Sequence, residues 1–343
     1  MTARRIRAVR STNAGIRVVE QDEPPGEGVE VVMATASICG SDLGFIAMGP
    51  LSFVLGHELA GWVDGRPVAI EPRLWCGECE ECAIGATQRC TRETRVIGCF
   101  SDGGMADVLR VSAARLGDTL FALPDSLPFA AAALAEPLSV ALHALRVAQV
   151  TAADRVAVLG AGPIGLCAVV MLRHLGVEDI AIFDPVEERL ARACALGAAH
   201  AVNVTAEPAP AALARVHGAG ERFGAPWVGT DVFLDCAGSG AALAEVLGVA
   251  KYRARVAVVA LHHKPLPVDL FRLMANEITI AGSIADDRPA EFGEALAMLA
   301  AGPCDLGPLI SHSYDFSRFH EALDMARDPA RAAKVMLTFG EAA

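Results

Sequence analysis

The segment Gly160–Gly165, which reads Gly-Ala-Gly-Pro-Ile-Gly, constrains the fold of this chain more than any other stretch. It matches the pattern G-x-G-x-x-G, it follows the short apolar run 156–159, and a helical pattern continues from it to residue 174. In this context the first glycine permits a tight turn, the second lets a pyrophosphate approach the backbone, and the third lets the helix pack on the strand. The stretch therefore predicts a strand, a turn and a helix whose N-terminus binds a dinucleotide.

Asp184 ends the next apolar run, about 20 residues after the last glycine of this motif. An acidic residue there accepts hydrogen bonds from both ribose hydroxyls of adenosine and repels a 2′-phosphate, so we expect NAD rather than NADP. Arg189 is placed to lie over the adenine. The alternatives are a structural helix cap for Asp184 and an ordinary surface charge for Arg189. The expected coenzyme contacts are Gly160, Gly162, Pro163, Ile164, Gly165, Asp184, Arg189, Cys236, Ala260, Leu261 and Ser283.

Strand and helix patterns alternate after residue 154, which predicts a parallel, doubly wound sheet. The N-terminal part differs, because short apolar runs alternate with turns from residue 5 to residue 111 and predict a small barrel. A helical stretch, 129–150, is expected to break near Glu136-Pro137, since proline fits the first position of a helix. The runs expected as strands of the parallel sheet are 156–159, 180–183, 201–204, 231–234, 256–260 and 278–281, and a last strand is expected at 334–339.

Four cysteines follow the spacing C-x2-C-x2-C-x7-C: Cys76, Cys79, Cys82 and Cys90. Thiolates at this spacing converge on one ion, and four of them complete a closed tetrahedral shell around zinc. Because a closed shell leaves no position for a substrate, this zinc is expected to fold a lobe over residues 75–91 and not to catalyse. Two disulfides or an iron–sulfur cluster are the alternatives. The glutamates between the cysteines disfavour a finger that reads nucleic acid.

A second group of metal-binding side chains lies earlier, on turn-forming stretches. Cys39-Gly40-Ser41-Asp42 and Gly56-His57-Glu58 contain a thiolate, an imidazole and a carboxylate, the three ligand types of catalytic zinc. A lone cysteine or histidine is more often a core residue, but this combination favours a metal site on Cys39, His57 and Glu58.

Three further side chains are expected to support this site. Asp42 is expected to accept a hydrogen bond from the second ring nitrogen of His57, which would fix the imidazole tautomer. Ser41 is placed to receive the proton of a bound alcohol. Glu136 is either another zinc ligand or an acid behind the ligands, because a lone carboxylate in an apolar helix pair is costly unless it is paired or metal-bound.

Composition bounds the class of protein. The chain has 343 residues, of which 53% are hydrophobic and 20% are charged, so two domains with sizeable cores are expected. The net charge of −12 argues against binding to nucleic acid or to an anionic membrane. The N-terminus lacks the apolar run of a secretory signal, and glycines and a proline interrupt the longest apolar run, 156–172. A cytoplasmic protein is therefore expected.

Taken together, these motifs resemble the zinc-dependent medium-chain alcohol dehydrogenase family over nearly the whole chain. The Glu136-Pro137 pair and the Cys-Gly-Ser-Asp form are most similar to the sorbitol, butanediol and threonine dehydrogenase branch. The matching segments are 39–42, 56–58, the four-cysteine lobe, 102–107, 123–125, 136–138, 160–165, 235–238 and 334–337.

The resemblance implies a fold, cofactors and an assembly. A GroES-like β-barrel catalytic domain is expected from residues 1–138 and 286–343, with a Rossmann dinucleotide-binding domain at 139–285 between them. Two zinc ions per chain are expected, with the catalytic zinc held by Cys39, His57, either Glu58 or Glu136, and water. The resemblance also implies a homodimer or homotetramer paired through the dinucleotide domains.

The implied reaction is reversible hydride transfer between NAD and a secondary alcohol or polyol, with zinc as the Lewis acid. A bulky cyclic or aromatic alcohol is the alternative substrate. A zinc-free reductase of quinones or enones and a non-catalytic binding protein are the alternative functions. Two departures from the family stand out: the segment 61–72 is short, and Gly44 replaces a histidine that often ends the proton relay. Proton exit must then use water or another group.

Overall fold

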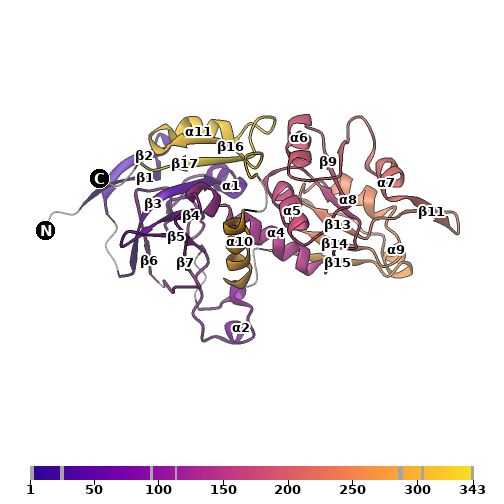
Figure 1. Cartoon of the computed structure of the whole chain (residues 1–343), viewed down its shortest axis with the longest axis horizontal. Coiled ribbons are helices and arrows are strands. Elements are labelled where there is room, and N and C mark those ends of the chain that lie inside the picture. The colour runs from indigo at the N-terminus through magenta and orange to yellow at the C-terminus, as the bar shows by residue number, and fades with distance from the viewer. Residues whose placement is uncertain are drawn as a thin grey trace.

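The computed structural model describes residues 4–23, 27–92, 96–112, 114–284, 289–302 and 305–340. Two large β-sheets lie at opposite ends of the molecule, with helices α4 (Ala135–Val147) and α10 (Pro289–Ala301) between them (Figure 1). One sheet is entirely parallel, and the other combines strands from both ends of the chain. This confirms the predicted fold class, a Rossmann sheet plus a GroES-like catalytic part. The expected domain boundary between residues 285 and 286 lies outside the described residues.

The parallel sheet has its six strands in the order β10-β9-β8-β13-β14-β15. Its central strands are continuous apolar runs, because helices cover both faces of such a sheet. The strand order reverses between β8 and β13, and ligands bind in the crevice outside the carboxyl ends at this point. The strands are β8 (Val156–Leu159), β9 (Ile180–Asp184), β10 (His200–Asn203), β13 (Val232–Asp235), β14 (Arg255–Val258) and β15 (Thr279–Gly282).

Helix α5 begins within the glycine motif, at Pro163, where a missing backbone N–H costs nothing. A hairpin after α7 was not expected from the sequence, because its residues include two glycines and a proline, are mostly exposed and carry no apolar alternation. Helices α5 (Pro163–His174), α6 (Glu187–Ala195), α7 (Ala209–His217), α8 (Gly240–Leu247) and α9 (Leu270–Ala275) and the hairpin strands β11 (Ala219–Arg222) and β12 (Ala225–Val228) complete this half.

The second sheet joins the two ends of the chain. Its order is β16-β17-β3-β4-β5-β7, and β6 also pairs with β3, so the C-terminal strand β17 lies directly beside the N-terminal strand β3. The bounds are β3 (Val29–Ile38), β4 (Glu58–Val63), β5 (Arg66–Ile70), β6 (Val108–Val111), β7 (Leu120–Ala122), β16 (Ile310–Asp315) and β17 (Lys334–Thr338), with a separate hairpin of β1 (Arg5–Thr12) and β2 (Gly15–Asp22).

The sequence predicts strands over residues 55–63 and 103–111, but the strands begin later, at Glu58 and at Val108. The residues before them form a close backbone contact instead of a ladder. Gly56 has a φ of +99°, and a Cβ on Gly103 would lie 2.4 Å from the Gly56 carbonyl oxygen. Glycine is required at both positions, and backbone N–H groups of residues 103–105 donate to carbonyl groups of residues 54–56 there.

The helix pair between the two halves breaks earlier than expected. Helix α3 (Phe129–Ala132) ends before α4, so Glu136 and Pro137 lie inside the first turn of α4, where proline disrupts no hydrogen bond. The segment 129–147 is long and apolar enough to cross a membrane by composition, but 61% of it is buried within the protein. The remaining helical turns are α1 (Gly40–Met48), α2 (Glu80–Ala83), α11 (Phe319–Ala326), η1 (Thr87–Arg89) and η2 (Phe316–Arg318).

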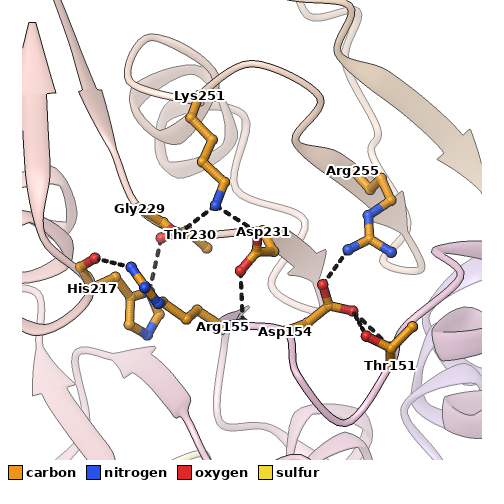
Figure 2. Close-up of polar contacts among 9 residues, drawn as sticks. All are labelled: Thr151, Asp154, Arg155, His217, Gly229, Thr230, Asp231, Lys251 and Arg255. Carbon is orange, nitrogen blue, oxygen red and sulfur yellow. Dashed lines mark hydrogen bonds and ion pairs between the residues drawn. The ribbon is translucent and has the colours of Figure 1, made fainter.

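Polar side chains tie the amino ends of the central parallel strands together, at the edge opposite the crevice (Figure 2). The Arg155 N–H donates to Asp231 Oδ2 at 2.9 Å, and Lys251 pairs with the other oxygen of Asp231 at 2.5 Å. Lys251 also donates to the Gly229 carbonyl, and Arg155 donates to the His217 carbonyl at 2.6 Å. These contacts anchor the β11–β12 hairpin and the starts of β8 and β13.

Candidate active site

Cys39 lies at the N-cap of helix α1, directly after the central strand β3. The sequence placed this motif on turn-forming residues, but residues 40–48 form a helix. The reason is Asp42, whose Oδ2 accepts a hydrogen bond from the Cys39 N–H at 2.8 Å and so completes the first turn. This cap fixes the backbone that carries Cys39 and Ser41.

Cys39, His57 and Glu58 each have one ligand atom within 4.8 Å of the other two. Strand pairing brings them together, because Ser37 near the end of β3 faces Glu58 at the start of β4. Glu58 is fully buried, and its Oε2 has no hydrogen-bond partner. A buried carboxylate oxygen left open beside a thiol and an imidazole matches the donor set of a catalytic zinc site.

Both ring nitrogens of His57 have polar neighbours. Ser41 Oγ lies 3.3 Å from Nε2, so the predicted association of Ser41 with this site is present. Asp42 Oδ1 lies 3.7 Å from Nδ1, which is ion-pair range but too long for the hydrogen bond expected from the sequence. Cys99 Sγ, at 3.8 Å from Nδ1, is a neighbour that no spacing pattern had marked.

The electrostatics of this cluster favour a cation. Burial lowers the pKa of His57, but the charges of Cys39 and Asp42 together raise it well above its ordinary value. The same negative potential that would hold a proton on the imidazole attracts a metal ion in its place. The three-residue cluster therefore suits a divalent cation in charge as well as in donor type.

Lys334 is a site residue that the sequence interpretation missed. It begins β17, its side chain is 1% exposed, and its Nζ pairs with Glu58 Oε1. Burial lowers the pKa of Lys334, but the charge of Glu58, its hydrogen bond and the nearby thiols together raise the pKa above its ordinary value, so the lysine stays protonated. One feature of the sequence could have identified Lys334 as a site residue: it is a charged residue directly before the apolar run 335–337, in a strand that is expected to be buried.

Glu136 lies in the first turn of α4, where it is half-buried, and its carboxyl group senses the charges of His57 and Glu58. Burial raises its pKa to about 7, His57 opposes that shift, and the charge of Glu58 adds to it. Glu136 does not belong to the group whose ligand atoms lie within 4.8 Å of one another. Glu58 therefore belongs to the cluster of possible ligands, and Glu136 lies outside this cluster.

The four-cysteine lobe has the geometry of a closed metal shell. All four sulfurs lie within 4.8 Å of one another, with 4.0 Å between Cys76 and Cys82 and 3.9 Å between Cys79 and Cys90. Sulfurs about 2.3 Å from a tetrahedral zinc are about 3.8 Å apart, whereas a disulfide is about 2.05 Å long. The N–H groups of Glu78 and Cys79 donate to Cys76 Sγ, as is expected around a thiolate.

The glycine motif makes the turn that the sequence predicts. Gly160 has a φ of +95°, which a side chain disfavours. A Cβ on Gly165 would lie 1.9 Å from the Gly160 carbonyl oxygen, so helix and strand pack at a distance that only glycine permits. A Cβ on Gly162 would meet nothing within 4 Å, so that position is open toward the crevice. Gly160 and Gly165 therefore have the expected structural roles, and Gly162 leaves the space that the expected approach of a pyrophosphate requires.

Asp184 ends β9 beside this turn, and both of its carboxylate oxygens meet backbone N–H groups. Oδ2 accepts from Ala161 at 2.9 Å, and Oδ1 accepts from Val186 at 2.9 Å. Arg189 lies 3.6 Å from Asp184 Oδ2. The acid therefore braces the glycine turn, and the arginine lies at the same end of the sheet, where an adenosine half binds.

The other expected coenzyme residues follow the carboxyl ends of β13, β14 and β15. Cys236 directly follows β13, Ala260 and Leu261 follow β14, and Ser283 directly follows β15. Burial raises the pKa of Cys236 to about 12, so its thiol stays protonated, and Leu261 is exposed. The Ser283 Oγ is buried without a hydrogen-bond partner, as a group that contacts a coenzyme would be.

Two side chains in this half were not singled out as site residues. Asp235, the last residue of β13, contacts His262 Nε2 through its Oδ2 at 2.5 Å. The contact joins the end of strand β13 to the loop after β14. The two residues lie side by side although they are far apart in the sequence.

Two family models match most of the chain. Residues 25–125 match the alcohol dehydrogenase GroES-like domain, and residues 163–301 match the zinc-binding dehydrogenase model. Both matches fall on the parts of the structure that carry the two sites described above.

Individual relatives align along nearly the full length. A sorbitol dehydrogenase of Arabidopsis thaliana is 31% identical, over 90% of this chain and 87% of its own. An L-threonine 3-dehydrogenase of Anaeromyxobacter sp. (strain K) is 29% identical, over 94% and 96%. Among solved structures, an alcohol dehydrogenase (rspB) of Escherichia coli CFT073, complexed with NADH, superimposes with a TM-score of 0.87 at 27% identity, over 98% and 99%.

Proposed function

Since the chain belongs to the zinc-dependent medium-chain alcohol dehydrogenase family, we propose that it is an NAD-linked dehydrogenase that reversibly oxidises a secondary alcohol or polyol to a ketone. The observation that carries the proposal is the convergence of Cys39, His57 and Glu58 in one buried cluster. The relatives named as sorbitol and threonine dehydrogenases support a polyol or secondary alcohol as the substrate class.

Cys39, His57 and Glu58 would hold the catalytic zinc. The open Glu58 Oε2 and the ligand atoms within 4.8 Å of one another support this set over one that includes Glu136. When bound there, zinc supplies Lewis-acid chemistry that polarises the alcohol oxygen and lowers its pKa. Glu136, with its pKa near 7, lies behind the ligands, where it exchanges a proton easily at neutral pH.

Ser41 receives the proton of the alcohol. Its Oγ lies 3.3 Å from the His57 ring, so it borders the place where the alcohol oxygen binds. Proton exit then uses water or another group, since Gly44 cannot accept a proton. The rings of Phe45 and Phe100 contact each other, with their centroids 6.1 Å apart. This aromatic pair supports a bulky cyclic or aromatic alcohol as the alternative substrate.

NAD occupies the crevice of the parallel sheet. The open face of Gly162, the helix N-terminus of α5 and the acid Asp184 support a pyrophosphate and an adenosine ribose that carries no 2′-phosphate. The unpartnered Ser283 Oγ supports the nicotinamide half. The sulfur spacings in the cysteine lobe support a second, structural zinc on Cys76, Cys79, Cys82 and Cys90.

The remaining proposals concern organisation. Residues 1–138 and 286–343 form the catalytic domain and residues 139–285 form the coenzyme domain; the two separate sheets support this division. We also propose that the enzyme works in the cytoplasm, as a homodimer or homotetramer, on a small-molecule substrate and without a nucleic-acid or membrane partner. The acidic net charge supports the last point.

The Cys39→Ser variant tests the proposal. We expect zinc content to fall from two ions to one per chain and turnover to fall at least about a thousandfold, because the Lewis acid is lost. The dissociation constant for NADH is expected to stay within about twofold, since the coenzyme half is untouched. Metal analysis, NADH fluorescence titration and a panel of polyols, 2-alkanols and cyclic alcohols provide the measurements.

Cys194→Ser is the matched control, because Cys194 is an exposed free cysteine far along the chain in α6. Undiminished turnover in Cys39→Ser would contradict the proposed mechanism. One zinc per chain in the wild type would favour a zinc-free reductase instead. If the wild type binds NADH but turns over no alcohol of the panel, a non-catalytic binding protein would be favoured.

A further inference from the structure

Asp235 and His262 form a side-chain pair in the coenzyme crevice that the proposed reaction does not use. Asp235 is fully buried at the end of β13, and His262 lies in the loop after β14 with its side chain 19% exposed. The His262 Nε2 and the Asp235 Oδ2 are 2.5 Å apart. A buried carboxylate with one partly exposed partner is an arrangement that orients that partner.

The backbone fixes Asp235 so completely that only one of its oxygens is left for His262. Its Oδ1 accepts hydrogen bonds from the N–H groups of Ala237 and Gly238, at 3.2 and 3.1 Å. Its main-chain carbonyl accepts from Val259 and Ala260, both at 3.0 Å. The remaining oxygen, Oδ2, is an acceptor, so the His262 Nε2 is the donor of this contact.

This contact fixes the chemical character of the other ring nitrogen. In a neutral imidazole whose Nε2 carries the proton, Nδ1 carries a lone pair and accepts hydrogen bonds. His262 Nδ1 has no hydrogen-bond partner among the described residues. His262 therefore presents a hydrogen-bond acceptor that Asp235 holds in place.

The pair stands beside the glycine turn. The Cys236 N–H donates to the Leu159 carbonyl at 2.9 Å, and a Cβ on Gly160 would lie 3.0 Å from Ala237. A Cβ on Gly238 would lie 2.8 Å from the Leu261 carbonyl oxygen, so the loops after β13 and β14 also touch each other. The segment 235–238 thus lies between the pyrophosphate-binding turn and the loop that carries His262.

We propose that His262, held by Asp235, is a positioning residue that accepts a hydrogen bond through Nδ1 from a hydroxyl of the nicotinamide ribose. The second half of a doubly wound sheet binds the second mononucleotide, and the group that follows the pyrophosphate along the coenzyme is that ribose. In the first half, the acid proposed to bind a ribose, Asp184, ends β9; in the second half, Asp235 ends β13, and the contact of its Oδ2 with His262 makes His262 the group that can reach a ligand. This inference rests on the proposed use of NAD.

A ladder of three ligands tests the contact without any turnover. ADP lacks the second ribose, ADP-ribose contains it, and NADH adds the nicotinamide. Isothermal titration of the full-length, zinc-loaded protein gives the dissociation constant for each. The key variant is His262→Gln, whose amide nitrogen replaces the Nε2 donor toward Asp235 but which has no acceptor at the position of Nδ1.

We expect His262→Gln to bind ADP-ribose and NADH about three- to tenfold more weakly and ADP with unchanged affinity, because one hydrogen bond is lost. His262→Asn places an amide oxygen near the position of Nδ1, and it is expected to recover most of the affinity for ADP-ribose. The neighbouring exposed histidine supplies the matched control, and His263→Gln is expected to bind all three ligands as the wild type does.

Three outcomes would overturn the inference. If His262→Gln lost affinity for NADH alone, the contact would be to the nicotinamide ring and not to the ribose. An equal loss for all three ligands would mean general damage to the crevice, and no loss at all would mean that Nδ1 faces only water. If the wild type binds none of the three ligands, the proposed NAD-linked function fails as well, so the two failures are distinguishable.

Discussion

At the scale of single residues, the candidate site is a place where charges are buried and depend on one another. Lys334 and Glu58 are 1% and 0% exposed, and they neutralise each other beneath Cys39 and His57. A buried ion pair adds little stability over an apolar pair, but removing one partner leaves an uncompensated charge in a medium of low polarity. Lys334 therefore offsets the charge of Glu58 and holds its side chain in place for a metal.

The Lys334→Met variant is expected to lower the free energy of unfolding by about 3–5 kcal/mol, because Glu58 is left buried without its partner. Urea unfolding of the zinc-loaded protein measures this value. The double variant Glu58→Gln with Lys334→Met is expected to lose less than the sum of the single variants, since the two residues are in contact.

Lys264→Met is the control for this prediction, because Lys264 is exposed. A loss in Lys334→Met no larger than in Lys264→Met would show that Glu58 does not need the lysine. Strict additivity in the double variant would count against a direct pair as well.

At the scale of elements, the turn between β8 and α5 separates two requirements for glycine. Gly165 is needed for packing, since its Cβ would lie 1.9 Å from a backbone oxygen of the same turn. Gly162 has open space around it, so the fold does not require glycine there, and the proposed requirement comes from the ligand. One motif thus contains a structural position and a proposed binding position three residues apart.

The pair Gly162→Ala and Gly165→Ala is expected to separate these two roles. Gly165→Ala should lower the free energy of unfolding by about 1–3 kcal/mol through overpacking. Gly162→Ala should unfold like the wild type but bind NADH at least about tenfold more weakly, because a methyl group blocks the approach of the pyrophosphate. Urea unfolding and NADH fluorescence titration measure the two effects. Equal behaviour of both variants in either measurement would refute the division.

At the scale of the whole molecule, exposed apolar side chains gather on the outer face of the coenzyme half. Leu270, Phe271 and Met274 of helix α9 are 72%, 74% and 63% exposed, and Val268 precedes them at 38%. This helix lies far from the catalytic sheet in Figure 1. Contiguous apolar surface of this kind marks a contact between proteins, and it supports the proposed pairing of subunits through this half.

The double variant Phe271→Asp with Met274→Asp is expected to shift the sedimenting species toward the monomer, because two charges would have to be buried in the contact. Leu116→Asp is the matched control on the catalytic half, where Leu116 is 79% exposed; it is expected to sediment as the wild type does. Sedimentation velocity at several protein concentrations distinguishes the species. A wild type that is monomeric throughout would end the proposal of an oligomer.

Much of the fold and of the candidate site follows from short spacings along the chain. The glycine motif and the four cysteines are each defined by short spacings, the acid Asp184 ends the next strand, and the structure has all three where the sequence predicts them. The wrong expectations are the hydrogen bond between Asp42 and His57 and several boundaries, such as the start of α4 before Glu136 and the helix at Gly40–Met48. Each boundary depends on a cap or a backbone contact that the apolar pattern does not contain.

The sequence by itself determined the alternation of strand and helix, the conformation of the glycine turn and the donor types of two metal sites, because these are properties of local stretches and of side-chain chemistry. Only the tertiary structure decided that Glu58 and not Glu136 joins the three-donor cluster, that Lys334 is paired beneath it, and that Asp235 holds His262. These contacts join residues far apart in the sequence, as Lys334 and Glu58 are, and nothing local encodes them. They exist because pairing of β3 with β4 and β17, and of β13 with β14, brings distant strands into register.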